Sequence, residues 1–292
     1  MDSESSVIQT QFDVLDPTQL KRIESVHRGF LYQHLYAVNC LLLAEKAGVA
    51  SVSVERDEDV ELNCKGDIHY IQVKTRVDAL QYSDIGGALD RFSAIRELHK
   101  QGIRQLPATF WIVSNADPSP NLKNTIANDF PKDVFVLSPN FSNRRHPALP
   151  DPAESVPEAL NSCVRIAEKL PFKALSAEAL ILKLAAVVQL ASMGASPREN
   201  HRFETRELPR LFEIVIVQLH ELPAPPTVYR NQENEPSFDS DQKIRLVIGH
   251  SGAGKTTWLA HGAILSADPV VYIDAGEGFG PSLAAVVARV AQ

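Results

Sequence analysis

Two polar side chains near the end of an apolar segment, with an acidic residue upstream, have the types and spacing needed for metal-assisted chemistry. Alternating apolar and polar residues predict two strands, 59–62 and 68–74, that form a hairpin. Gln72 and Lys74 stand two residues apart and therefore share a face, and we expect Asp59 to lie beside them. Carboxylate and amide oxygens can bind Mg²⁺, and a nearby lysine can orient water and contact a phosphate. These residues predict metal-dependent hydrolysis of a phosphodiester.

The order of these residues resembles a known nuclease core. Asp59 followed by Gln72-Val73-Lys74 resembles the PD-(D/E)xK pattern, with glutamine in the middle acidic position. Upstream, the segment RGFLYQ at residues 28–33 opens an apolar helix, and together the two features resemble the double-stranded DNA endonuclease domain of CBASS anti-phage effectors. The resemblance implies one Mg²⁺ held by Asp59, the Gln72 side-chain oxygen and the Val73 carbonyl. Lys74 would position the attacking water.

Neighbouring polar residues are weaker candidates for the same site. Glu55 ends a predicted strand just before the hairpin, so it is the flanking acid most expected to touch the metal. Gln33 belongs to the helix segment that carries the family resemblance. The other acidic residues of this stretch, Asp57, Glu58 and Glu61, are expected to form a solvated face. The alternative for the whole hairpin is an exposed sheet edge whose polar residues are merely solvated.

Composition sets broad limits on the protein class. The 292 residues are 44% hydrophobic and 22% charged, which is ordinary for one large or two smaller globular domains. The net charge of −7 argues against a large DNA footprint, but it does not exclude a nuclease whose DNA channel is built by oligomerisation or by local basic patches. Cys40, Cys64 and Cys163 form no CxxC pair, which argues against disulfides and zinc and fits a reducing cytoplasm. The apolar helix expected at 177–193 carries charges and is not a membrane span.

The remaining periodicity predicts an α/β fold of the restriction-endonuclease type, with a mixed sheet and flanking helices. Helices are expected at 16–23, 29–47 and 83–100, and further strands at 49–54, 109–114 and 133–137. Helices at 156–170, 177–193 and 204–222 would form an α-helical subdomain.

The most specific motif in the chain is a phosphate-binding loop. Residues 249–256, GHSGAGKT, match GxxxxGK[ST] in full. A strand at 244–248, a helix at 257–265 and a second strand at 270–274 are expected around it. The glycines would let backbone N–H groups wrap phosphate oxygens, while the lysine meets the β/γ-phosphates and the threonine binds Mg²⁺. The residues expected to bind ATP are Gly249, Gly252, Gly254, Lys255, Thr256 and Thr257.

This arrangement predicts a nuclease core at 1–150, a helical subdomain completing it at 151–222, a linker at 223–242 and the beginning of a P-loop NTPase domain at 243–292. A nuclease followed by a P-loop resembles the STAND NTPases of anti-phage defence. The resemblance implies a cytoplasmic protein that forms homo-oligomers on activation, with a phage-derived trigger acting on a longer protein. The charged residues in the longest apolar helix predict that the protein has no membrane partner.

The sequence therefore favours a Mg²⁺-dependent double-stranded DNA endonuclease that is regulated by ATP. The first alternative is a nucleotide-binding regulatory protein whose nuclease-like domain is catalytically dead and serves for assembly. A second is a P-loop enzyme without nuclease activity. Whether residues 243–292 suffice to bind or hydrolyse ATP stays open.

Overall fold

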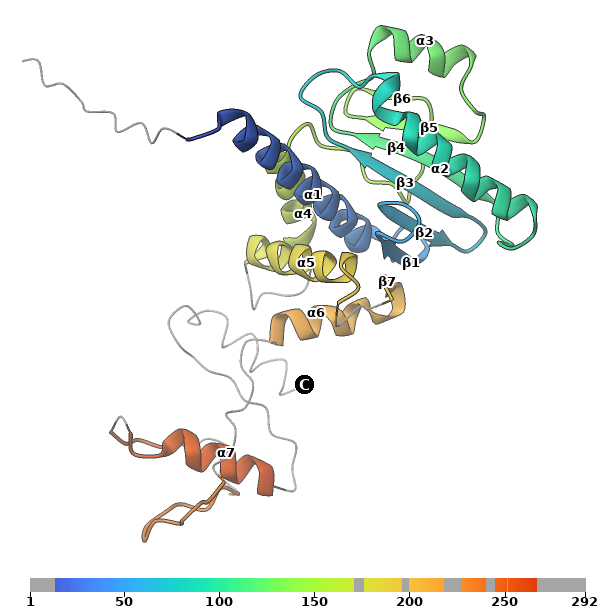
Figure 1. Ribbon diagram of the computed structural model, residues 1–292. Coiled ribbons are helices and arrows are strands. Elements are labelled where there is room, and N and C mark those ends of the chain that lie inside the picture. Colours follow the sequence, from blue (N-terminus) through green and yellow to red (C-terminus); the bar gives the residue numbers. More distant parts are fainter. Residues whose placement is uncertain are drawn as a thin grey trace, which may run out of the picture. The chain divides into compact units, whose positions relative to one another are not determined.

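The computed structural model describes residues 14–170, 176–195, 200–217, 227–239, 245–250 and 252–266. Two compact units divide the chain, Met1–Leu211 and Phe212–Gln292. The first contains a seven-stranded mixed sheet with flanking helices (Figure 1). This architecture agrees with the restriction-endonuclease-like fold that the sequence predicts.

The sheet combines parallel and antiparallel strands. In spatial order they are β6 (Phe141–Ser142), β5 (Val134–Ser138), β4 (Ala108–Ser114), β3 (Ile68–Lys74), β2 (Val60–Cys64), β1 (Val49–Val54) and β7 (Arg202–Glu204). β3, β4 and β5 are parallel, and the remaining pairs are antiparallel. The carboxyl ends of β3 and β4 therefore meet at one edge, the usual location of ligand sites in parallel sheets.

The predicted hairpin is formed by β2 and β3, with Val60 paired to Ile71. The two strands lie inside the sheet, flanked by β1 and β4, so the alternative of an exposed edge hairpin is wrong. Leu62 and Ile71 are fully buried, and hydrophobic burial thus fixes the register. Asp59 lies just before β2 rather than inside it.

One face of the sheet is covered by α2 (Tyr82–Lys100) and α3 (Pro120–Asn128). In Figure 1, α2 runs alongside the strands, in nearly the same direction as β3. The core between them includes Tyr70, Ile85, Phe92, Phe110, Ile112, Leu122, Val134 and Val136. The spacing of the apolar residues predicts α2 to within one residue. α3 is absent from the sequence prediction because it is short and only Leu122 and Ile126 are buried on it.

The first helix, α1 (Pro17–Leu43), is continuous where the sequence predicts two helices. Asp16 caps it, accepting hydrogen bonds from the backbone of Thr18 (2.9 Å) and Gln19 (3.0 Å), as expected of an Asp-Pro start. Gly29 does not interrupt the helix. A Cβ added at Gly29 would lie 3.2 Å from Thr75 Oγ1, so glycine permits a close approach of α1 to the end of β3.

The helices after β6 also belong mostly to the first unit. α4 (Val156–Ala167) and α5 (Ala177–Ser192) pack against α1, and their positions confirm two predicted helices. The third predicted helix, 204–222, is partly wrong. Residue 204 belongs to β7, which pairs with β1, and Thr205–Glu207 form a short 3-10 helix. The helix itself, α6, spans Leu208–Val217, and residues 218–222 of the prediction lie outside the described residues.

The second unit contains α7 (Lys255–Leu265), which begins two residues earlier than predicted. The strand predicted at 244–248 is not formed at residues 245–248. No strand in the described part of this unit is available to pair with them. The predicted strand at 270–274 lies outside the described residues. None of the helices in the described segments is both long and apolar enough to span a membrane.

Candidate active site

Asp59 is held against the end of β3 by two hydrogen bonds. Its Oδ2 accepts one from the backbone N–H of Val73 (2.7 Å) and one from the side-chain amide of Gln72. The N–H and C=O of a strand residue point to the same side, so the Val73 carbonyl also faces the Asp59 side. Both of these bonds reach Oδ2, and no described residue donates to Oδ1.

Lys74 completes the set that the sequence predicts. It lines a surface pocket of about 320 Å³ at the end of β3. The pocket residues are Ser25, Val26, Gly29, Phe30, Gln33, Asp59, Gln72, Val73, Lys74 and Thr75. Lys74 forms no ion pair with a described residue, yet its positive charge lowers the pKa of Asp59 and of Glu58. The structure thus brings a carboxylate, a backbone carbonyl, an amide and an ammonium group to one pocket.

Burial is the dominant influence on the Asp59 carboxyl. Desolvation raises its pKa to about 6, although the Val73 hydrogen bond acts in the opposite direction. Nearby Glu55 raises it further, and Lys74 and Arg91 lower it. A half-buried carboxylate that is difficult to ionise gains from a neighbouring cation, which is the property expected of a metal ligand.

The Gln72 side-chain amide directs its nitrogen, and not its oxygen, toward Asp59, whereas the metal-ligand prediction requires the oxygen there. Its oxygen accepts a hydrogen bond from Arg91 on α2, and its nitrogen donates to Asp59. Arg91 carries only donors, so it attracts the oxygen, whereas the Asp59 carboxylate attracts the nitrogen. Ligation of a metal by Gln72 would require its amide to turn by half a rotation.

Arg91 was not among the predicted residues, nor was its second partner, Glu58. Glu58 is buried, with its carboxylate 3.1 and 3.2 Å from the Arg91 guanidinium. Desolvation outweighs the attraction of Arg91 and raises the Glu58 pKa to about 7. Glu61 is also buried and accepts a hydrogen bond from the backbone of Asp57 at 2.8 Å. The prediction of a solvated acidic face is therefore wrong for these two glutamates, because both face α2 and its loops.

Gln33 and Glu55 contact each other rather than Asp59. The Gln33 side-chain amide donates to Glu55 Oε1, which joins α1 to the turn after β1. Glu55 has a φ of 47°, a left-handed conformation that is uncommon for a residue other than glycine. Only Gln33 of this pair lines the pocket.

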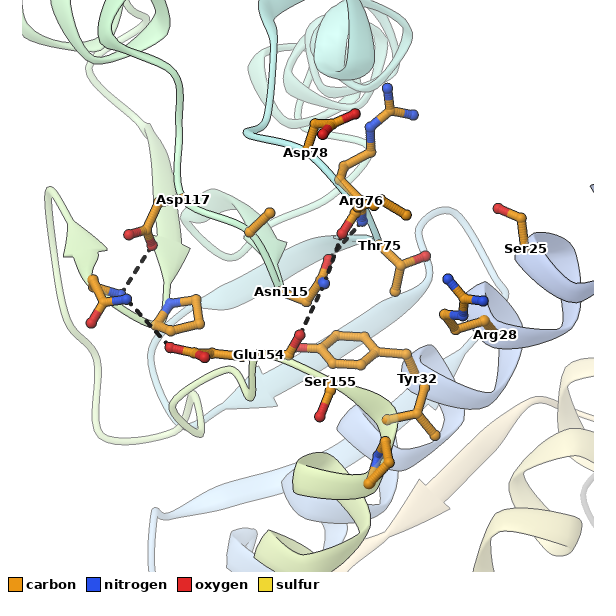
Figure 2. A pocket seen from close by; sticks show the side chains of 16 residues that line it. Ser25, Arg28, Tyr32, Thr75, Arg76, Asp78, Asn115, Asp117, Glu154 and Ser155 are labelled. Atoms are coloured by element: carbon orange, nitrogen blue, oxygen red, sulfur yellow. Dashed lines mark hydrogen bonds between the residues drawn. The ribbon is translucent and has the colours of Figure 1, made fainter. Parts of the chain in front are cut away.

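A larger pocket of about 790 Å³ opens where β3 and β4 end, as Figure 2 shows. Arg28 and Tyr32 enter it from α1, and Arg76 and Asn115 from the ends of the two strands. Asn115 accepts a hydrogen bond from the Arg76 N–H (2.6 Å) and donates to the Arg76 and Glu154 carbonyls (2.9 and 3.1 Å). The two pockets share Ser25 and Thr75 in their linings. Polar residues directly after two parallel strands are the sequence signal that could have indicated Arg76 and Asn115.

Comparison with protein families agrees with this geometry. Residues 24–138 match the family model of the Cap4 dsDNA endonuclease domain. The matched segment runs from within α1 to the end of β5, and it includes Gln33, Asp59, Gln72 and Lys74. The match supports a DNA nuclease domain in this part of the chain. No curated protein matches the chain.

The predicted phosphate loop lies in the second unit. Gly252 and Gly254 have φ values of 80° and 79°, which glycine adopts without strain. Lys255 Nζ donates to the carbonyls of Gly249 and His250, both at 2.7 Å. Gly249, Gly254, Lys255 and Thr257 line a pocket of about 370 Å³ together with Tyr229 and Trp258.

Proposed function

We propose that this protein is a Mg²⁺-dependent double-stranded DNA endonuclease whose active site lies at the end of β3. The observation that carries the proposal is the convergence of Asp59, the Val73 carbonyl and Lys74 on one pocket, within a segment that matches a DNA nuclease domain. The family match supports the substrate, and the donor chemistry supports the ion.

The residues present fit a Mg²⁺ ion. Mg²⁺ prefers oxygen ligands, and it is commonly bound by one or two carboxylates with water completing its shell. Asp59 offers the Oδ1 atom that no described residue bonds, and Val73 offers a carbonyl on the same side of the strand. Gln72 either orients Asp59, as it does in this structure, or turns its oxygen to the ion. When bound, the ion neutralises charge that develops on the scissile phosphate.

Lys74 acts on the attacking water. Its ammonium group shares the pocket with Asp59 and has no ion pair among the described residues, so it can donate to water and to a phosphate oxygen. Phe30 and Val26 line the same pocket, and both side chains are about half exposed. The roles of Gln33 and Glu55 are positional, since their mutual hydrogen bond fixes α1 beside the site.

The larger pocket provides contacts to the DNA backbone. Arg28 is exposed and has no ion pair with another described residue. Arg76 lies near it but is paired with Asp84 at 2.7 Å. Because two arginines do not offset a net charge of −7, tight DNA binding requires several copies of the chain.

We also propose that the nuclease is the effector of an ATP-regulated anti-phage protein. The complete P-loop sequence and the positive φ angles of Gly252 and Gly254 support ATP binding, with Mg²⁺ contacted by Thr256. Binding of a phage-derived trigger would promote homo-oligomerisation, and so assemble the DNA channel.

The test is cleavage of supercoiled plasmid by the purified chain with and without Mg²⁺. We expect Mg²⁺-dependent nicking and linearisation, and loss of both in Asp59→Asn. Asp129→Asn, an exposed carboxylate at the end of α3, is the matched control and should cleave like the unmodified chain. Equal cleavage by Asp59→Asn and Asp129→Asn would refute the assigned site.

One observation favours a catalytically dead nuclease-like domain as the second candidate. The Gln72 oxygen is already bonded to Arg91, which leaves fewer ligands directed at an ion. This candidate predicts that no divalent ion supports cleavage, while DNA binding and assembly persist. The same plasmid assay, repeated with Mn²⁺, separates the two.

A further inference from the structure

The turn between β2 and β3 holds a second cluster of ligand-type side chains. β2 and β3 pair Leu62 with His69, and directly opposite residues of an antiparallel pair share a face. Cys64, two residues beyond Leu62, therefore lies on the His69 face. A thiol sulfur, a carboxylate oxygen of Asp67 and a ring nitrogen of His69 all lie within 4.8 Å of one another.

His69 leaves one buried nitrogen without a partner. The side chain is 1% exposed, and its Nε2 has no hydrogen bond within the described structure. The other ring nitrogen, Nδ1, bonds to the hydroxyl oxygen of Thr109, which also accepts the indole N–H of Trp111 at 3.1 Å. The indole N–H of Trp111 lies between two acceptors, Thr109 Oγ1 at 3.1 Å and His69 Nδ1 at 3.3 Å. When it donates to Thr109, Nδ1–H can donate to the same hydroxyl oxygen, and Nε2 then carries a lone pair. Metal-binding histidines are typically oriented in this way by a partner on the second nitrogen.

In this tautomer the lone pair of Nε2 faces a carboxylate. Asp67 Oδ1 is 3.5 Å from Nε2, too far for a hydrogen bond and close enough for two electron-rich atoms to repel each other. A cation between the two groups would satisfy both.

We propose that Cys64, Asp67 and His69 form a Zn²⁺ site at the β2–β3 turn. Thiolate, imidazole and carboxylate are the three ligand types that zinc takes in proteins. Ligands at tetrahedral Zn²⁺ lie about 3.3–3.8 Å apart, so the side chains need to close by about 1 Å from their present spacing. Water would complete the coordination of the ion. His146 lies nearby, with its ring centroid 4.2 Å from that of His69 and the two rings tilted by 50°, and its Nδ1 accepts a hydrogen bond from the Ala148 N–H.

This site is separate from the candidate active site. His69 and Gln72 project from opposite faces of β3, and the turn is at the other end of that strand from Lys74. The sequence pattern, with no CxxC pair, argues against zinc because a single cysteine is a weak signal. The other two ligands, Asp67 in the turn and His69 on β3, can be placed beside Cys64 only when the register of the hairpin is known.

The experiment uses the untagged chain, stripped of metal and titrated with Co²⁺. Co²⁺ substitutes for Zn²⁺ and reports thiolate ligation by near-ultraviolet charge-transfer absorption. We expect saturation at about one equivalent. The band should disappear in Cys64→Ala and persist in Cys163→Ala, whose thiol is elsewhere in the first unit. An ion at Asp59 gives no such band, because no cysteine lines that pocket.

A second variant tests the site even if Cys64→Ala does not fold. Asp67 is partly exposed, so Asp67→Asn should fold, keep the thiolate band and weaken Zn²⁺ binding in competition titrations by at least about tenfold. Absence of a stoichiometric band in the unmodified chain, persistence of the band in Cys64→Ala, or unchanged affinity of Asp67→Asn would each overturn the site.

Discussion

Glu58 shows at the scale of a single residue how the candidate site departs from ordinary surface chemistry. Its pKa is raised from 4.5 to about 7 by burial. The native state therefore binds more protons than the unfolded state between these values. The contribution of protonated Glu58 to the free energy of unfolding is fully present below pH 4.5, and it is lost as the pH rises through about 7. At neutral pH the folded protein therefore contains a buried Glu58 carboxylate whose ionisation lowers the stability of the fold.

Replacement of Glu58 by glutamine tests this directly. Glu58→Gln keeps an oxygen for Arg91 and removes the titration, so its free energy of unfolding should exceed that of the unmodified chain increasingly from about pH 5 to about pH 8, by on the order of 1–3 kcal/mol. Denaturant unfolding at several pH values measures the difference. Glu97→Gln, on the exposed side of α2, should show no such trend. A pH-independent difference for Glu58→Gln would contradict the raised pKa.

Sequence reasoning reached Asp59, Gln72 and Lys74 because their spacing on one strand has a direct geometric meaning. It missed Glu58 and Arg91, whose contact joins residues 33 positions apart. Arg91 stands off the apolar stripe of α2 and resembles any solvated helix residue in the sequence. Only the packing of α2 on the sheet shows that it contacts Gln72.

At the scale of elements, α1 is supported unevenly. Residues 17–28 are exposed, whereas residues 32–41 are buried. The first half of the helix depends on its cap, yet it supplies Ser25 and Arg28 to the pockets.

We therefore expect Asp16→Ala to fray this half of α1. Loss of an aspartate cap costs about 1 kcal/mol of local helix stability. Amide exchange at residues 18–28 should accelerate while the global unfolding midpoint stays unchanged, because these residues contribute little buried surface. Asp16→Asn, which can still accept from the backbone, should protect the segment. Equal exchange in the two variants would show that the cap is unimportant.

The elements that the sequence predicted well are those with a long apolar pattern, such as β1, β3 and α2. β7 is three residues long and exists because β1 offers it a free edge. That dependence joins positions about 150 residues apart and leaves no local signal. The strand predicted at 244–248 shows the reverse case, an apolar run with no described partner strand.

At the scale of the whole molecule, charge and unit organisation determine two expectations. With a net charge of −7, single copies should bind DNA weakly, and both strands of a duplex must be cut. Linearisation rates should therefore rise more steeply than the first power of protein concentration. A titration of the chain against fixed plasmid measures the order. Strict proportionality would count against assembly.

The second expectation concerns Lys255. The proposed nuclease residues all belong to the first unit, while Lys255 belongs to the second. Lys255→Ala should leave the basal plasmid cleavage of this chain unchanged and remove any ATP binding. Loss of cleavage in the absence of ATP would mean that the second unit is needed for the active site itself.

Lys74 gives the most direct measurement of the central claim. It is half-buried and has no ion pair among the described residues, so Lys74→Ala should change stability by no more than about 1 kcal/mol. In a single-turnover plasmid assay with Mg²⁺, we predict that Lys74→Ala loses at least about 100-fold in cleavage rate. Lys100→Ala, an exposed lysine at the end of α2, should cleave normally. Cleavage by folded Lys74→Ala at the rate of the unmodified chain would contradict the assignment of this pocket as the nuclease site.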